Sequence, residues 1–524
     1  MTISMEKHKY DLELIADLCK RGAKKRVIDI AKEYCDLVNI DYSENVRKRI
    51  NNLVVAYRKS KSFDISELED YKKAKKRKVK KGSKRFIVTY AQSHTPIDNN
   101  AFDGMEAYAK EIGAEIIIIP GVYSVPNSDY KQLDTGWHPR VLPYMYARED
   151  KLHKFLTIIS DANVLPTAER PLRGFEGVTG EESSIVGHPR HHIEVVPTLP
   201  QSRDKFLMTT GAITVPNYRD ARVGKKAKFH HQIGFLVVEI FDKEHFNFRQ
   251  VSCDKSGGFQ DLMYVWDGKS LTKEGVWDTV VLGDLHLGHH DVDLLDATMD
   301  VAESMGTKYV VTHDIFDGRS VNHHAERDFV QQVINEKHDY DDLETEIEEM
   351  IDWLDDWSER FKVVVVPSNH NDWLDRWVRG RDSKVSPKNA VLFNKFRSVL
   401  YDEGAPRGLV AHVIDEEFKG EVITLHRDDS FKRKGHELNN HGDLGSNGAK
   451  GTPNTFKKLN VKIVSGDKHF LYTLDGAYGV GVSSNRKHGY NNGLSSWTVS
   501  HGVINGNGKF QHLIYVDGKF SELF

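Results

Sequence analysis

The sequence has few of the features that mark secreted or membrane proteins. Its three cysteines, Cys19, Cys35 and Cys253, are scattered, so they predict neither a disulfide framework nor a zinc site and fit a reducing compartment. It contains no apolar run of about 18 residues or more, the length that a membrane-spanning helix needs. The N-terminus also lacks the apolar core of a signal peptide. These absences predict a cytoplasmic protein with no membrane partner.

A strong net charge is also missing. The 73 Lys and Arg residues nearly balance the 77 Asp and Glu residues, so only the local distribution of charge can indicate a nucleic-acid partner. Hydrophobic residues make up 39% of the chain and charged residues 29%, as in a globular protein. The 524 residues are too many for one ordinary hydrophobic core, and a chain of this length is expected to form about two to four domains.

Residues 1–62 have apolar side chains at helical spacing. Ser43 is placed to cap a helix with basic residues in its first turns. Together with the apolar stripe at residues 27–34, this pattern resembles a helix-turn-helix whose basic helix contacts DNA. The alternative is a small helical bundle with a solvated basic face. The basic residues concerned are Arg47, Lys48 and Arg49.

Residues 72–85 form a basic run in which ten of fourteen residues are Lys or Arg. Like charges at this density repel one another and usually lie in an exposed or disordered segment, so residues 63–84 are predicted to be a basic linker. Beside a helix-turn-helix pattern, the run favours an arm that binds DNA through its phosphates, although a solubilising linker would have the same composition. The candidate DNA contacts are Lys75, Lys76, Arg77 and Lys78.

Residues 85–270 are predicted to form an α/β middle domain. Strand-like segments at 86–90 and 115–120 enclose a helical segment at 103–112, which predicts a parallel β-α-β unit.

Two loops of this middle domain have an unusual composition. Residues 187–192 read Gly-His-Pro-Arg-His-His, and residues 224–231 read Gly-Lys-Lys-Ala-Lys-Phe-His-His. Glycine beside basic and imidazole groups suits a loop that contacts phosphate. The same composition suits a plain surface loop, and the sequence does not decide between them.

Residues 275–524 contain four short apolar runs, each followed by side chains that bind metals. Such runs are typical of buried parallel strands, and ligands in these folds collect at the carboxyl ends of the strands. We therefore expect the loops to converge on one site that holds two divalent ions, as in metal-dependent phosphoesterases. The side chains are Asp284, His286, Asp314, Asn369, His370, Asp467 and His469, with His441 between the last two runs.

Each residue type suits this chemistry. Asp284 and His286 lie on the same side of an extended backbone because side chains alternate along it. Asp314 is the natural carboxylate to bridge two ions, and Asn369 offers a neutral oxygen ligand. His370 can protonate a leaving oxygen.

The order of these groups resembles the calcineurin-like metallophosphoesterase family. The resemblance implies that one ion is held by Asp284, His286, Asp314 and His469, and the other by Asp314, Asn369, His441 and Asp467. It implies that His370 is the general acid or transition-state stabiliser. The segment His313–Gly318 resembles a form found in SbcD-type DNA nucleases, which favours a nuclease over a phosphoprotein phosphatase.

The resemblance extends to large phage-encoded metallophosphoesterases, which include the early DNases of T-odd coliphages. It is carried by the segments 174–177, 210–217, 440–443 and 493–497. The fold it implies is α/β, with a C-terminal calcineurin-like metallophosphoesterase sandwich after the middle domain and the helix-turn-helix-like domain. It also implies two divalent ions, with Mn²⁺ favoured over Mg²⁺, DNA as the partner, and a homo-oligomer, dimeric or larger.

Two residues depart from the family pattern. His313 stands where a glycine is usual, and Asp467 stands where the first histidine of Gly-His-x-His is usual. Aspartate suits Mn²⁺ and Mg²⁺, which prefer oxygen ligands. The leading hypothesis is a phage-type DNase that degrades host DNA early in infection. The alternatives are a phosphomonoesterase or phosphoprotein phosphatase, and a DNA-binding regulator with a degenerate phosphoesterase domain.

Overall fold

The computed structural model shows a mixed α/β protein. The chain falls into two compact units, Met1–Lys73 and Ala74–Phe524. The described residues are 14, 17–18, 27–38, 42–44, 46–48, 50, 69–80, 82–123, 136–199, 201–322, 328–380, 385–402, 404–486, 491–516 and 518–524.

The N-terminal unit contains helix α2 (Val27–Leu37), which buries an apolar face against Leu18 and Ile50. The Oγ of Ser43 accepts the N–H of Val46 at 3.3 Å, which confirms the predicted helix cap. Of the predicted DNA contacts in this unit, Arg47 forms an ion pair with Glu44, Lys48 is exposed, and Arg49 lies outside the described residues. The helix-turn-helix itself stays a prediction.

The basic run begins within helix α4 (Glu69–Lys76). Beyond it, the guanidinium of Arg77 approaches Glu115 to 3.4 Å and donates to the carbonyl of Ile116 at 3.1 Å. The run is therefore helical at its start and anchored at Arg77, and this differs from the open arm expected from charge alone. Lys75, Lys76 and Lys78 are exposed.

The predicted β-α-β unit is confirmed. Strands β1 (Arg85–Gln92) and β2 (Glu115–Gly121) pair in parallel, and α5 (Asn99–Ile112) connects them. β8 (Gly234–Ile240) and β9 (Phe246–Ser252) complete a four-stranded sheet in the order β2-β1-β8-β9.

A ten-stranded sheet crosses the boundary expected near residues 270–275. Its order is β17-β18-β19-β21-β20-β6-β7-β5-β4-β3. The antiparallel pair β6–β20 joins strands of the middle segment to strands of the C-terminal segment, so these two predicted domains share a sheet. The strands are β3 (Glu149–His153), β4 (Leu156–Ile159), β5 (Ser183–Val186), β6 (His192–Val196), β7 (Lys205–Thr209), β17 (Lys432–Arg433), β18 (His436–Glu437), β19 (Lys462–Ser465), β20 (Tyr472–Leu474) and β21 (Ala477–Gly479).

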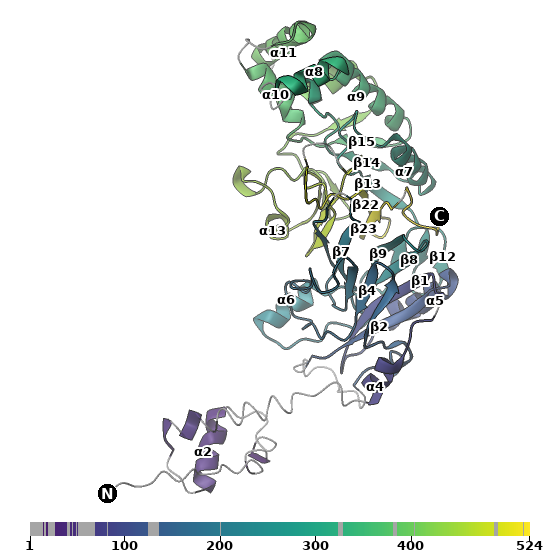
Figure 1. Cartoon of the computed structure of the whole chain (residues 1–524), viewed down its shortest axis with the longest axis vertical. Coiled ribbons are helices and arrows are strands. Elements are labelled where there is room, and N and C mark those ends of the chain that lie inside the picture. Colours follow the sequence, from purple (N-terminus) through teal and green to yellow (C-terminus); the bar gives the residue numbers. More distant parts are fainter. Residues whose placement is uncertain are drawn as a thin grey trace. The chain divides into compact units, whose positions relative to one another are not determined.

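A six-stranded sheet carries most of the predicted ligand loops. Figure 1 shows β15, β14, β13, β22 and β23 in order, and β16 pairs at the free edge of β15. The four strands β13 to β16 are mutually parallel, whereas β22 and β23 are antiparallel. The bounds are β13 (Trp277–Val281), β14 (Tyr309–Thr312), β15 (Lys362–Val365), β16 (Val422–Thr424), β22 (Ser500–Asn505) and β23 (Phe510–Ile514).

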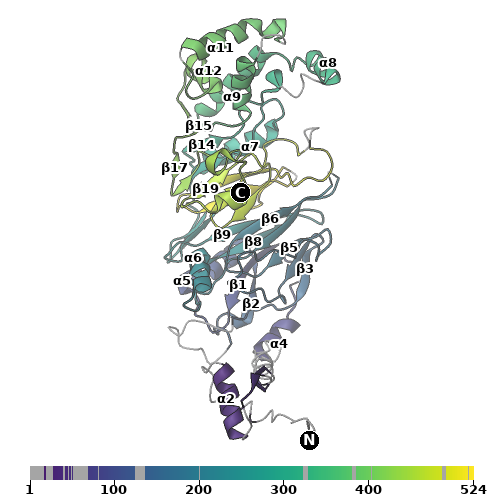
Figure 2. The same cartoon turned by 90° about the vertical axis from the view of Figure 1, so that its left-hand side faces the viewer.

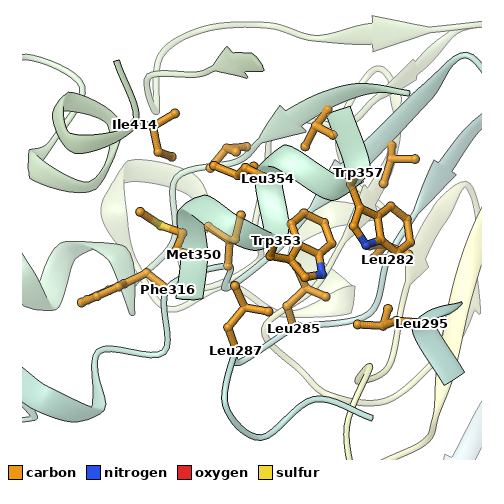
Figure 3. Packing of buried hydrophobic residues seen from close by; sticks show 14 of the residues in the cluster. Leu282, Leu285, Leu287, Leu295, Phe316, Met350, Trp353, Leu354, Trp357 and Ile414 are labelled. Atoms are coloured by element: carbon orange, nitrogen blue, oxygen red, sulfur yellow. The ribbon is translucent and has the colours of Figure 1, made fainter. Parts of the chain in front are cut away.

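Apolar side chains cover both faces of this sheet. On one face, Trp353 and Trp357 of α9 (Leu343–Ser358) pack near Leu282 and Leu285 (Figure 3). On the other, residues of the six-stranded sheet such as Val311 share a cluster with residues of the ten-stranded sheet. The acidic segment 329–361 forms two helices, α8 (Phe329–Lys337) and α9.

Figure 2 shows α9, α11 and α12 gathered at one end of the larger unit. The helices of this region are α7 (Val292–Ser304), α8 (Phe329–Lys337), α9 (Leu343–Ser358), α10 (Asn371–Arg379), α11 (Ala390–Asp402) and α12 (Leu409–Glu417). The remaining elements are α6 (Arg222–His230), α13 (Pro453–Phe456), β10 (Phe259–Asp261), β11 (Tyr264–Trp266), β12 (Leu271–Thr272), and the 3-10 turns η2 (Leu142–Tyr144), η3 (Arg319–Val321), η6 (Pro387–Asn389) and η7 (Ser446–Gly448). In the part of the chain described here, no helix is both long and apolar enough to span a membrane.

Candidate metal centre

The loops after β13 and β14 are joined by backbone hydrogen bonds at the carboxyl edge of the six-stranded sheet. The N–H of His286 donates to the carbonyl of Asp314 at 2.9 Å, and the N–H of Leu285 donates to that of His313 at 2.9 Å. The N–H of Asp284 donates to Gly481 at 3.0 Å, which links the first loop to the segment after β21. Two ligand loops are therefore held in register by main chain alone.

Four predicted ligands form one buried group. The ligand atoms of Asp284, His286, Asp314 and His469 all lie within 4.8 Å of one another. Nε2 of His469 lies 3.0 Å from Oδ2 of Asp284 and 3.2 Å from Nε2 of His286. Nε2 of His286 lies 3.6 Å from Oδ2 of Asp314. Buried carboxylates and imidazoles at these separations can hold a metal ion.

The polar atoms of this group are poorly satisfied without an ion. Among the described residues, Oδ1 of Asp284 and Oδ1 of Asp314 are buried and accept no hydrogen bond. The two Nε2 atoms of His286 and His469 point at each other, and two imidazole nitrogens that face an acidic pair can share a cation. Buried polar atoms normally have partners, so the donor set fits a divalent ion.

The second predicted ligand set is more open. Nε2 of His441 lies 3.3 Å from Oδ2 of Asp314 and 3.9 Å from Oδ1 of Asp467. Oδ1 of Asn369 is buried without a hydrogen-bond partner among the described residues. The ammonium group of Lys468 forms a close ion pair with Asp467. A second ion at this position would compete with Lys468 for the Asp467 carboxylate.

His370 lies at the edge of the first group, 4.6 Å from His286 between ring centroids. Its Nδ1 is 2.6 Å from the carbonyl oxygen of Asp317. A carbonyl only accepts, so Nδ1 carries a proton and Nε2 is the other functional nitrogen. Its ring stacks on Trp373 at 4.1 Å. The carbonyl of Asp317 and the ring of Trp373 together fix the orientation of the His370 imidazole.

Asp317 is a functional residue to which the sequence assigned no role. Its Oδ1 lies 2.8 Å from Nδ1 of His286, which leaves Nε2 of His286 for a metal. Asp317, His286 and His370 also form a second group with ligand atoms within 4.8 Å. The signal was present in the segment His313–Gly318, where Asp317 follows Asp314 by three residues.

His313 is the second residue without an assigned role. It is fully buried, and neither ring nitrogen has a hydrogen-bond partner among the described residues. Its ring lies 5.5 Å from that of His441. A Cβ at Gly466 would lie 2.0 Å from Oδ1 of Asp284 and 3.0 Å from Cγ of His313, so only glycine fits there. His313, which stands where the family pattern has glycine, therefore adds an imidazole directly beside the predicted ligands.

Electrostatics couple the two sets. Burial opposes ionisation of Asp314, but the imidazoles of His441 and His370 outweigh it and hold its pKa well below the usual value. Burial would lower the pKa of His441, but the charge of Asp314 raises it to about 10. Burial likewise opposes the charge of His286, and Asp317 and Asp314 raise its pKa to about 9. The protons on the imidazoles of His286 and His441 therefore supply the positive charge that a bound metal ion would supply.

Burial has the opposite effect on two other imidazoles. It lowers the pKa of His313 to about 4, with a further contribution from the charge of His441. It also lowers the pKa of His370. The His313 ring is therefore neutral at neutral pH, the form in which an imidazole nitrogen can bind a metal.

The fold and the site together define a mixed α/β protein with a buried His/Asp cluster that can hold a metal ion. The chain is 30% identical over 476 residues to Protein A1 of Escherichia phage T5, an alignment that covers 84% of this chain and 83% of the T5 protein. The chain therefore belongs to the same family as T5 protein A1. No family model matches it, and no solved structure matches it.

Proposed function

We propose that this protein is a calcineurin-like, metal-dependent phosphodiesterase that hydrolyses DNA. The observation that carries the proposal is the convergence of Asp284, His286, Asp314 and His469 within 4.8 Å. Three of these come from loops after adjacent parallel strands, and His469 comes from the loop after β19 in the other sheet. A site at the carboxyl ends of strands between two packed sheets supports the calcineurin-like arrangement.

The residues present fit a first ion better than a second. Asp284, His286, Asp314 and His469 would hold the first, and Asp314, Asn369, His441 and Asp467 the second. Bound divalent ions, with Mn²⁺ favoured and Mg²⁺ accepted, would neutralise the phosphate and act as Lewis acids. His313 would add a nitrogen donor near the second set, where Asp467 replaces the usual histidine.

His370 would act on the leaving group. The Asp317 carbonyl holds its Nδ1–H, and Trp373 fixes the ring plane, so Nε2 is the nitrogen that can face a phosphate. When protonated, Nε2 can give its proton to the departing sugar oxygen. A lowered pKa makes that proton easier to release.

DNA is the proposed substrate because of charge outside the site. The exposed Lys75, Lys76 and Lys78 supply the sequence-blind phosphate affinity that a DNase needs. The relationship to a phage protein supports a phage setting, and degradation of host DNA in the host cytoplasm is the role proposed there. A homo-oligomer remains a prediction.

A single comparison of substrates tests this proposal. The full chain is incubated with linear DNA, circular DNA and a small phosphomonoester, each with Mn²⁺, Mg²⁺ or chelator, beside the variant Asp284→Asn. We expect Mn²⁺-dependent loss of DNA that the variant abolishes, and loss of the circular substrate would identify an endonuclease. Hydrolysis of only the phosphomonoester would replace the proposal with a phosphatase.

The pairing of Lys468 with Asp467 favours a second candidate, a DNA-binding regulator with a degenerate phosphoesterase domain. An ammonium group held against this carboxylate weakens the second ion site. Intact DNA under every condition, together with tight DNA binding, would favour the regulator.

A further inference from the structure

A polar cavity lies away from the metal centre. It has a volume of about 350 Å³ and is lined by Arg190, His191, Phe229 and His230. Arg190 and His191 come from the segment 187–192, and Phe229 and His230 come from the segment 224–231, which lies almost wholly in helix α6 and is not the loop expected from its composition. The fold brings these two segments, whose composition suits phosphate contacts, together at the cavity. Lys462, at the amino end of β19, also lines it. The metal ligands lie beyond the carboxyl end of β19, roughly 15 Å away along the strand.

The cavity has positive charge in excess. Arg190 is 2% exposed, and its Nη1 contacts both carboxylate oxygens of Asp475 at 3.0 and 3.2 Å. Nε and Nη2 of Arg190 are buried and have no hydrogen-bond partner among the described residues. Asp475, the sole carboxylate among the described lining residues, also lies 3.2 Å from His192 and 3.4 Å from His230. It has little capacity left for a further cation.

Two lysines add to this excess. Lys457 and Lys462 line the cavity, and within the ranges the structure describes neither forms an ion pair with a carboxylate. Burial, with the charge of Lys509, lowers the pKa of Lys462. A buried guanidinium with free N–H groups beside lysines that lack counter-ions is a site for an anion, since an anion would supply both charge and acceptors.

The mouth of the cavity also offers a flat apolar surface. Phe229 of α6 lines it and is 81% exposed, which is unusual for so large an apolar ring. His512 also lines the cavity and is buried, and its Nδ1 lacks a hydrogen-bond partner among the described residues. A ligand with a phosphate at one end and a planar ring at the other would use both features.

We propose that this cavity binds a nucleoside 5′-monophosphate, with its phosphate at Arg190, Lys457 and Lys462 and its base on Phe229. The phosphate is the chemistry that the cations recognise, and it can belong to a free nucleotide or to the 5′ end of a DNA strand. The site does not depend on the metal centre, so it stands or falls separately from the proposed nuclease function.

Calorimetric titration of the full chain with dAMP tests the proposal, with and without Mn²⁺. We expect one site per chain in both conditions, because the cavity needs no metal. The variants Lys457→Gln and Lys462→Gln should each weaken dAMP binding by about tenfold, the effect of losing one charge-assisted contact. Lys458→Gln is the matched control, because Lys458 is exposed, adjacent to Lys457 and outside the cavity lining.

Three further ligands and one further variant separate the parts of the proposal. Deoxyadenosine should bind at least tenfold more weakly than dAMP, and Phe229→Ala should weaken dAMP without weakening inorganic phosphate. Tight binding of a 5′-phosphorylated oligonucleotide would assign the site to strand ends, whereas preference for dAMP would assign it to free nucleotides. Equal binding of deoxyadenosine and dAMP, or equal loss with Lys458→Gln, would overturn the proposal.

Discussion

Replacing Asp314 with asparagine is the sharpest test of the metal centre. Its Oδ2 lies 3.3 Å from Nε2 of His441 and 3.6 Å from Nε2 of His286, so one carboxylate contacts ligands of both predicted sets. Asparagine keeps the shape and removes the charge. Two unit charges about 4 Å apart interact by about 4 kcal/mol in a partly screened protein site. The substitution should therefore cost at least this much binding free energy for a divalent ion, which corresponds to a rise of about a thousandfold in Kd.

The fold should survive this substitution. Asp314 contributes most to raising the pKa of His441, ahead of Asp284 and Asp467. Without Asp314 the imidazole therefore loses its proton more readily, so the substitution need not leave a buried cation without a partner. Calorimetric titration with Mn²⁺ and cleavage of circular DNA are the two assays, and thermal unfolding checks the fold. Asp428→Asn is the control, because that side chain is 93% exposed. Mn²⁺ affinity and cleavage both close to wild type would refute the assignment of Asp314 as a shared ligand.

Three other outcomes follow from the same geometry. Because the pKa of buried His286 is raised to about 9, its stabilising charge is fully present below pH 6.5 and is lost as pH rises to 9. Protein kept in chelator should lose on the order of 3 kcal/mol of unfolding free energy over that window. Added Mn²⁺, which needs the neutral ring, should stabilise the protein more as pH rises. His370→Gln should lower kcat by about 10² to 10⁴ with Mn²⁺ affinity retained, and an unchanged kcat would remove His370 from proton transfer. Changing Lys75, Lys76 and Lys78 together to Gln should reduce the slope of log K for DNA against log salt by about 3, and an unchanged slope would show that these lysines do not contact phosphates.

Local patterns predicted the elements well where one segment determines its own structure. The runs before Asp284 and Asp314 form buried strands because β-branched residues suit a sheet covered on both faces. The β-α-β unit of β1, α5 and β2 followed from short connections between adjacent elements. The expectation that ligands collect at strand ends follows from the same rule, and four of them do lie together.

Pairings across long stretches of chain could not be predicted. β6 and β20 pair through Ile193 and Thr473, although the residues between them include most of the six-stranded sheet. Strands this short carry no sequence signal for a distant partner. Arg77 likewise belongs to a run whose charge suggested an open arm, and only the fold brings Glu115 to it. The segments 187–192 and 224–231, which meet at the polar cavity, were ambiguous for the same reason, and the second of them forms helix α6 where a loop was expected.

The ligand loops share a conformational feature that explains their placement. His286, Asp314, Asp467 and His469 all have positive φ, between 46° and 61°. Few residues other than glycine adopt this region, although Asn, Asp and His do so several-fold more often than others, and each such residue costs about 1–2 kcal/mol. Glycine would relieve this strain but has no ligand atom. The chain thus keeps aspartate and histidine where the backbone favours glycine, and binding of an ion by these side chains would offset the strain that places them.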